Sequence, residues 1–150
     1  MLPLEPHLET WSRRPSSRRG RPPLLFVHGG YTDGWCWTPY FLPWFASRGW
    51  PAHALSLRGH GNSAGAGTLF ATGLDDYAAD VERVAGTLKE PPVLIGHSMG
   101  AAIVERMLAS PTFQKLRPIE DRMIRTPIAE HRRVLAELGI ALTADTFAAV

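Results

Sequence analysis

The sequence predicts an α/β protein with a mostly parallel sheet and helices on both faces of that sheet. Two observations support this prediction. Between residues 22 and 110, short apolar runs alternate with stretches that have helical periodicity. The apolar runs also lack the polar–apolar alternation of strands with one face in water, as expected for strands that helices cover on both faces. A chain of 150 residues is long enough for one such domain.

Three apolar runs are predicted as strands because they are short, rich in Leu, Val and Ile, and end in glycine or polar turn residues. They are residues 23–30 (PLLFVHGG), 51–57 (PAHALSL) and 93–96 (VLIG). If each strand is followed by a helix, as in βαβ units, the strands run parallel to one another.

Helices are predicted between and after these strands. Residues 40–49 form the first, which ends at Gly49 and carries Pro43 in its first turn. In residues 74–88 the apolar side chains recur at spacings of three and four, which is typical of an amphipathic helix. Residues 99–108 form the third helix.

Composition divides the chain into three parts. Residues 1–21 are rich in Arg, Pro and Ser, which predicts a flexible leader. Residues 22–110 form the predicted core. Residues 111–150 are predicted to be a helical tail, since Thr126-Pro127 is a good helix start and no further strand pattern follows.

Charge and cysteine content exclude several classes of function. The net charge is only +2, so we expect no nucleic-acid partner despite the five Arg residues between positions 13 and 21. No apolar run is long enough to span a membrane. Cys36 is the single cysteine, which excludes an intrachain disulfide and favours a cytoplasmic location.

Ser98 is the residue that most clearly suggests chemistry. It lies in Gly96-His97-Ser98-Met99-Gly100, a G-x-S-x-G pattern between a predicted strand and a predicted helix. A serine on such a sharp turn holds its Oγ clear of the sheet, next to the free N–H groups of a helix N-terminus. The alternative interpretation is a serine that only caps the helix.

A second glycine motif is predicted at the same edge of the sheet. His28-Gly29-Gly30 follows the first strand, and open α/β sheets bind ligands at the carboxyl ends of their strands. The glycine backbone there can direct an N–H group at a substrate oxygen. The alternative is an ordinary Gly-Gly turn.

Three motifs together resemble the α/β-hydrolase family, and in particular its serine esterases and lysophospholipase-like enzymes. They are LLFVHGG (residues 24–30), LRGHGNS (57–63) and VLIGHSMG (93–100), in the order and spacing of the family. The resemblance covers about residues 22–110 and implies an α/β-hydrolase fold of which only the N-terminal part is present.

The resemblance implies a role for individual residues. Ser98 is the expected nucleophile, and the backbone N–H groups of Met99 and Gly30 are the expected oxyanion hole. His28 and His97 are expected to shape the site rather than to act as base. The serine favours hydrolysis of a carboxylic ester or related acyl compound through an acyl-enzyme, without metal or organic cofactor. Branches of the family that hydrolyse epoxides or haloalkanes resemble this chain but have Asp at that position.

Aromatic residues follow the second motif and are the expected substrate-binding residues, above all Tyr31, Trp35 and Trp37. They can wall an apolar pocket for a small-molecule ester or acyl substrate. The alternative is that this aromatic stripe is part of the core. Cys36 among them is expected to pack rather than to react.

The acid and base of the family's triad are not evident. His131 is the only histidine after Ser98, and Asp121 precedes it in the expected order, but neither follows a predicted strand. His131 also lies on the apolar side of its predicted helix, where packing is the alternative role. We therefore expect the family's C-terminal strands to be missing and the tail to be the start of a lid. The alternative function is a truncated, non-catalytic remnant that binds an apolar ligand or a partner, with self-association through an exposed sheet edge.

Overall fold

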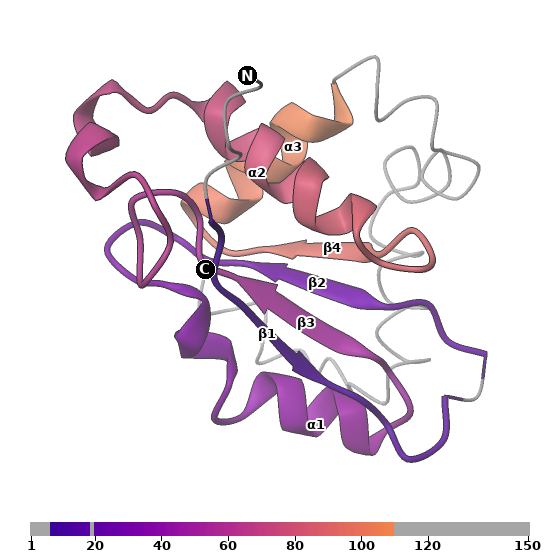
Figure 1. Cartoon of the computed structure of the whole chain (residues 1–150). Helices are drawn as coiled ribbons and strands as arrows, with labels where there is room; N and C mark the ends of the chain where they lie inside the picture. Colours follow the sequence, from indigo (N-terminus) through magenta and orange to yellow (C-terminus); the bar gives the residue numbers. More distant parts are fainter. Residues whose placement is uncertain (1–6, 19, 110–150) are drawn as a thin grey trace, which may run out of the picture. The chain divides into compact units, whose positions relative to one another are not determined.

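The computed structural model describes residues 7–18 and 20–109, which form a four-stranded sheet in the order β1-β3-β2-β4 (Figure 1). The strands are β1 (Thr10–Arg13), β2 (Leu24–Val27), β3 (Ala52–Leu55) and β4 (Val93–Gly96). β2 is parallel to β3 and to β4, whereas β1 is antiparallel to β3. The carboxyl ends of the three parallel strands therefore share one edge of the sheet, as the sequence predicts.

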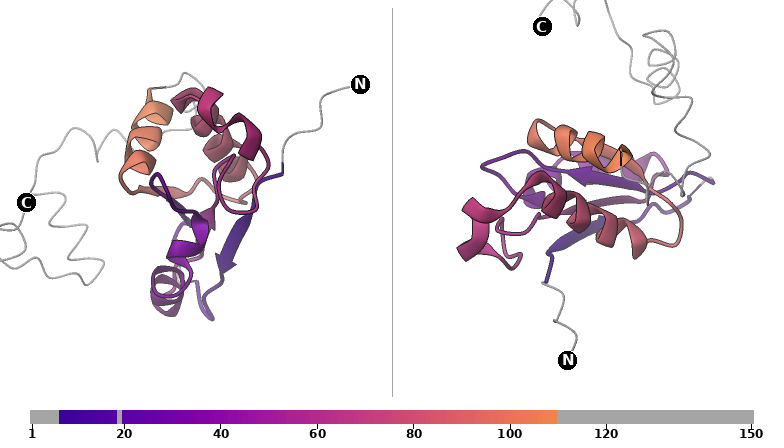
Figure 2. Two further views of the ribbon diagram at one scale, coloured as in Figure 1. Left: turned by 90° about the vertical axis from the view of Figure 1, so that its left-hand side faces the viewer. Right: turned by 90° about the horizontal axis from the view of Figure 1, so that it is seen from above.

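Helices cover both faces of this sheet. Helix α1 (Phe41–Ser47) lies on one face, and helices α2 (Leu74–Gly86) and α3 (Met99–Leu108) lie on the other (Figure 2). β2 separates two apolar clusters: Leu25 and Val27 pack toward α2 and α3, whereas Leu24 and Phe26 pack toward α1. Because both of its faces are covered, all four residues of β2 are buried. The predicted α/β class with a mostly parallel sheet is thus confirmed.

Local signals explain where the helices begin. Asp75 and Asp76 lie in the first turn of α2, where their negative charge meets the positive end of the helix dipole. The carboxylate of Asp76 also accepts a hydrogen bond from the backbone N–H of Gly73 at 2.9 Å. Pro43 lies in the first turn of α1, where its missing N–H has no partner in the helix to lose. Two short 3₁₀ helices, η1 (Gly34–Trp37) and η2 (Ala66–Ala71), occupy loops that the sequence pattern does not resolve.

Strand β1 corrects the expectation of a flexible leader over residues 1–21 at Thr10–Arg13; residues 1–6 and 19 lie outside the described residues. Thr10–Arg13 pair with β3, and Trp11 packs against the cluster on the α1 face. The strand was missed because its pattern is short and polar: Trp11 is its only half-buried residue, and the other three are exposed. An outer strand needs few apolar residues, and charges such as Arg13 protect it against pairing with other chains.

β4 differs from β2 in its cover. It pairs only with β2 among the residues that the structure describes, and each of its four residues is half-buried rather than buried. The predicted helical tail over residues 111–150 lies outside the described residues. Within the described part of the chain, no helix has the length and apolar character that a membrane span requires.

Candidate active site

Ser98 lies at the junction of β4 and α3 in a strained backbone conformation. Its φ of 54° and ψ of −120° lie in a region that residues with a side chain rarely adopt. Among the described residues, Tyr31 is the other non-glycine residue with positive φ, at 60°. Both residues adjoin the carboxyl edge of the sheet, and Ser98 is exposed. Such strain is kept only where the surrounding packing enforces it.

Two glycines enforce the sharp turn. A Cβ on Gly96 would lie 2.5 Å from the carbonyl oxygen of Gly100, and a Cβ on Gly100 would lie 2.6 Å from that of His28 and overlap that of Val27. The start of α3 therefore presses directly on the end of β2. Only hydrogen atoms fit at these two positions, which explains the spacing of the G-x-S-x-G motif.

The loop after β2 adjoins Ser98. A Cβ built on Gly29 would lie 3.2 Å from the Cβ of Ser98 and 3.2 Å from the carbonyl oxygen of His97. The N–H of His97 also donates to the carbonyl oxygen of Val27 at 3.1 Å. The structure thus brings together the two glycine motifs that the sequence places at this edge. We call residues 28–34 the oxyanion loop, after the role that we propose for it below.

His28 is fully buried, and both of its ring nitrogens are in use. Nε2 accepts a hydrogen bond from the N–H of Leu57 at 3.0 Å, so Nδ1 carries the proton and donates to the carbonyl oxygen of Gly29 at 2.7 Å. Burial lowers the pKa of His28 because the charged imidazolium loses its hydration, and this outweighs the hydrogen bond to Gly29. The ring is therefore a neutral link between the ends of β2 and β3.

His97 has a different environment from His28. It is exposed, and its ring meets the edge of the Trp37 ring with centroids 6.4 Å apart. It precedes the strained serine on the turn formed by residues 96–100, which we call the elbow.

The middle motif, residues 57–63, is fixed to α2 by an ion pair that sequence reasoning missed. Arg58 Nη2 donates to Asp80 Oδ1 at 2.8 Å, and Arg58 Nε and backbone N–H both donate to Asp80 Oδ2 at 2.9 Å. These bonds to the Asp80 carboxylate raise the pKa of Arg58. Asp80 is fully buried within α2. An acidic residue at a buried position of the helix pattern was the signal that could have revealed it.

The three expected substrate-binding aromatics have different environments. The side chains of Tyr31 and Trp35 are exposed, whereas Trp37 is 8% exposed. The Trp37 ring packs against Phe26 and Phe41, with centroids 5.1 Å and 4.9 Å away. Its indole Nε1 is buried and has no hydrogen-bond partner within the described residues. Trp37 is therefore part of the apolar cluster on the α1 face and contacts the ring of His97, while Tyr31 and Trp35 face solvent.

The remaining expectations concern the downstream acid and histidine, Cys36 and metal binding. His131 and Asp121, the downstream histidine and acid, lie outside the described residues. Burial raises the pKa of the Cys36 thiol, which keeps it protonated and a poor nucleophile. Within residues 7–18 and 20–109, no three His, Cys, Asp or Glu side chains gather in an arrangement that could hold a metal ion.

Comparison with known proteins agrees with this geometry. The chain is 36% identical over 92 residues to protein phosphatase methylesterase 1 of Mus musculus, which covers 59% of this chain and 24% of that protein. It is 28% identical over 81 residues to a pyrethroid hydrolase of Sphingobium wenxiniae, which covers 54% of this chain and 28% of that protein. The chain thus spans about a quarter of the length of these curated relatives.

Solved structures show the same fold. The thioesterase domain of a curacin biosynthetic pathway superposes with a TM-score of 0.58 at 28% identity, over 69% of this chain and 36% of that one. Epoxide hydrolases are also among the similar structures. The model of the Alpha/beta hydrolase family matches residues 24–149, which include the elbow, the oxyanion loop and the middle motif at residues 57–63. From this match and the arrangement of the elbow, we conclude that the chain belongs to the α/β-hydrolase family.

Proposed function

We propose that this chain carries the nucleophile and the oxyanion hole of a carboxylic ester or related acyl hydrolase, with Ser98 as the nucleophile. The observation that carries the proposal is the strained conformation of Ser98 on an exposed turn, held by two glycines with no room for a side chain. A serine that merely capped a helix would need no such strain, and Ser98 makes no capping hydrogen bond to α3.

In this mechanism the Oγ of Ser98 attacks the carbonyl carbon of the substrate while a base takes the Oγ proton. The carbonyl π electrons move to the oxygen, and the N–H groups of Met99 and Gly30 stabilise its charge. When the C–O bond to the alcohol breaks, the protonated base supplies the proton of the leaving alcohol. Water then hydrolyses the acyl-enzyme by the same steps. His131, the only histidine after Ser98 in the sequence, is the proposed base.

The proposed substrate is a small-molecule ester or acyl compound with an apolar part. Tyr31 lies in the oxyanion loop and Trp35 directly follows it. Both have exposed aromatic rings that can contact an acyl or alcohol group of the substrate. Trp37 is buried in the apolar cluster on the α1 face, so it supports the elbow through its contact with His97 rather than facing the solvent. Hydroxyl attack at position 98 suits acyl carbons, which supports ester or thioester over epoxide chemistry for this chain.

Covalent labelling with a fluorophosphonate tests the proposal. We expect the 150-residue chain to be phosphonylated and Ser98→Ala to abolish the labelling, because the probe reacts with activated serines. Ser47→Ala is the matched control, since Ser47 is also exposed but its hydroxyl donates to the carbonyl oxygen of Trp44 and accepts from Arg48. Labelling that survives in Ser98→Ala would show that another residue reacts.

A second candidate function rests on β4, whose outer edge is unpaired within the described residues. Unpaired strand N–H and C=O groups can bind an extended segment of a partner or a second copy of the chain. In that case the elbow only supports the fold, and the chain does not hydrolyse a substrate. A folded chain that stays unlabelled and sediments as a dimer would favour this function over hydrolysis.

A further inference from the structure

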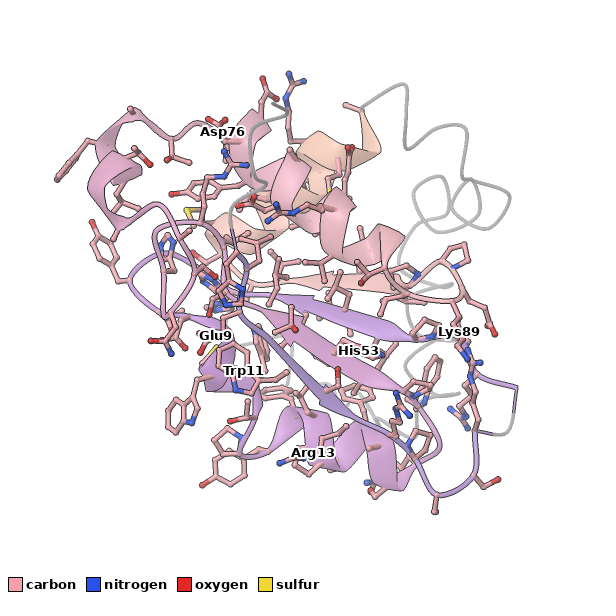
Figure 3. The ribbon with its side chains drawn as sticks, viewed as in Figure 1. Glu9, Trp11, Arg13, His53, Asp76 and Lys89 are labelled. Atoms are coloured by element: carbon pink, nitrogen blue, oxygen red, sulfur yellow. The ribbon has the colours of Figure 1, made fainter. Side chains whose placement is uncertain are left out.

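Glu9, which precedes β1, is held by its backbone beside the end of β3. Its N–H donates to Ser63 Oγ at 2.9 Å, and its carbonyl oxygen accepts from the N–H of Ser56 at 2.8 Å. Figure 3 shows Glu9 next to Trp11 at the end of the sheet where β2 and β3 terminate. The N-terminal segment thus reaches the edge of the sheet that carries the candidate site.

Both oxygens of the Glu9 carboxylate accept hydrogen bonds. Oε2 accepts from the hydroxyl of Ser56 and from the N–H of Asn62, both at 3.0 Å, and Oε1 accepts from the side-chain amide of Asn62 at 2.6 Å. Burial alone would raise the pKa of Glu9, but the bonds from Asn62 and Ser56 outweigh it and leave the pKa below its usual value. Glu9 is therefore a carboxylate at neutral pH.

Ser56 links Glu9 to the oxyanion loop through its hydroxyl group. Its side chain is fully buried, and its hydroxyl donates a hydrogen bond to the carboxylate of Glu9. The same oxygen accepts a hydrogen bond from the backbone N–H of Gly34 at 3.1 Å. Gly34 lies so close to β3 that a Cβ there would be 2.5 Å from the carbonyl oxygen of Leu55. A continuous chain of bonds therefore runs from Gly34 through Ser56 to the charge of Glu9.

The oxyanion loop is consequently fastened at both ends to the segment after β3. His28 is bound to the N–H of Leu57 at one end, and Gly34 is bound to the hydroxyl of Ser56 at the other. Gly30 lies between these two points. A carboxylate acceptor strengthens the bond that fixes Ser56, because hydrogen bonds to charged groups are about twice as strong as neutral ones.

We propose that Glu9 is a positioning residue for the oxyanion loop, which it holds through the hydroxyl of Ser56 and the N–H of Gly34. The link from Glu9 to Gly34 does not depend on the proposed function. Only its consequence, that the loop directs the N–H of Gly30 at a substrate oxygen, rests on that function. Glu9 touches no reacting atom. Its effect on chemistry is to keep the loop in the one conformation that accepts a developing negative charge.

Amide hydrogen exchange at Gly34 tests the positioning directly. We expect exchange about tenfold faster in Ser56→Ala and in Glu9→Gln, since each variant weakens a charge-assisted chain of bonds. The double variant should exchange no faster than the faster single variant, because both changes break one chain. Glu90→Gln is the matched control: Glu90 pairs with Arg18 on the surface and should leave Gly34 unchanged.

A second measurement connects the loop to reactivity. In Glu9→Gln we expect the bond-forming step of Ser98 phosphonylation to slow about tenfold, with no change in the reversible binding of the probe, because a misplaced oxyanion donor acts on the charged transition state. Asn62→Ala, which removes a surface donor to Glu9, should give a smaller decrease in the same step.

The two measurements separate the two proposals. If the unaltered chain is not phosphonylated, the hydrolase proposal fails, and Gly34 exchange still decides the role of Glu9. Unchanged Gly34 exchange in both single variants would overturn the positioning proposal. It would also be overturned if amides of β2 and α3 accelerated as much as Gly34, because Glu9 would then stabilise the whole fold rather than the loop.

Discussion

The two turns that meet at the candidate site are held in different ways. The elbow at residues 96–100 is held by close contact: Gly96 and Gly100 leave no space for a side chain against neighbouring carbonyl groups. The oxyanion loop at residues 28–34 is held by two hydrogen bonds with the segment after β3: His28 accepts from the N–H of Leu57, and the N–H of Gly34 donates to the hydroxyl of Ser56. The elbow depends mainly on shape, whereas the oxyanion loop depends mainly on polar groups and on the charge of Glu9.

The difference predicts different responses to change. Steric contact between backbone atoms does not depend on pH or salt, so the elbow should keep its shape until the fold is lost. Hydrogen bonds through a histidine and a carboxylate respond to protonation and to single-atom substitutions. The strained serine thus lies on the more rigid turn, and the loop that we propose to carry an oxyanion donor is the more adjustable one.

The largest effect is expected from adding one methyl group to the elbow. Gly100→Ala would press a Cβ against the carbonyl oxygens of Val27 and His28, so β2 and α3 would have to separate. We expect a loss of about 3 kcal/mol in the free energy of unfolding, measured by urea denaturation.

Gly86→Ala provides the control for this change. Gly86 ends α2, and a Cβ there has no neighbour within 4 Å. This substitution should stabilise the chain by about 0.5 kcal/mol because it restricts the unfolded state. Equal effects of the two substitutions would contradict the steric account of the elbow.

A smaller effect is expected at the hydrogen-bonded anchor. His28→Leu leaves the N–H of Leu57 without its buried acceptor, so we expect a loss of about 2 kcal/mol in urea denaturation. The variant should also show faster amide exchange at Leu57. Exchange at Ala101, in α3 directly after the elbow, should stay closer to that of the unaltered chain. Acceleration at both sites alike would contradict separate support for the two turns.

The same histidine predicts a dependence on pH. Burial lowers the pKa of His28 in the folded chain, so below about pH 6.5 the unfolded chain binds a proton that the folded chain does not. Stability is therefore present at neutral pH and decreases as the pH falls below that value. The pKa of His53 is lowered in the same way, chiefly by burial. Urea titrations between pH 7 and 5.5 should show a shallower decrease in His28→Leu and also in His53→Gln.

The smallest effect is expected on the outer surface of the helices. Arg106 of α3 binds the carboxylate of Asp75 at the start of α2, but both side chains are exposed to solvent. Because water and salt screen both this pair and the attraction of Asp75 to the helix dipole, Asp75→Asn should lower the urea midpoint only slightly at physiological salt. A clear shift would show that this pair, rather than the buried clusters, holds α3 against α2.

Much of the fold was predictable because its signals are local. The three parallel strands and the three helices follow from apolar runs, periodicity and turn residues that lie within the elements themselves, and α3 was predicted with its observed bounds. The family and the elbow followed from motifs of a few adjacent residues. Ser98 as nucleophile, Met99 and Gly30 as oxyanion hole, and His131 as base stay predictions until labelling tests them.

What could not be predicted depends on contacts between residues far apart in the sequence. Glu9 acts on Gly34 through Ser56, and Asp80 fixes Arg58 across the loop after β3. No spacing rule connects such positions, because the chain brings them together only when the sheet forms. β1 was missed for a related reason: as an outer strand with one half-buried side chain, it has no periodic pattern of its own.

The place of β1 bears on where this domain can be trimmed. The family pattern begins at residue 24, so a boundary drawn from motif similarity would remove residues 7–13 as an expendable extension. That cut would expose the hydrogen-bonding edge of β3, which β1 now covers, and uncover apolar surface beneath Trp11. Purification tags and proteolytic cleavage sites should therefore leave residues 7–13 in place, so that β1 stays paired with β3.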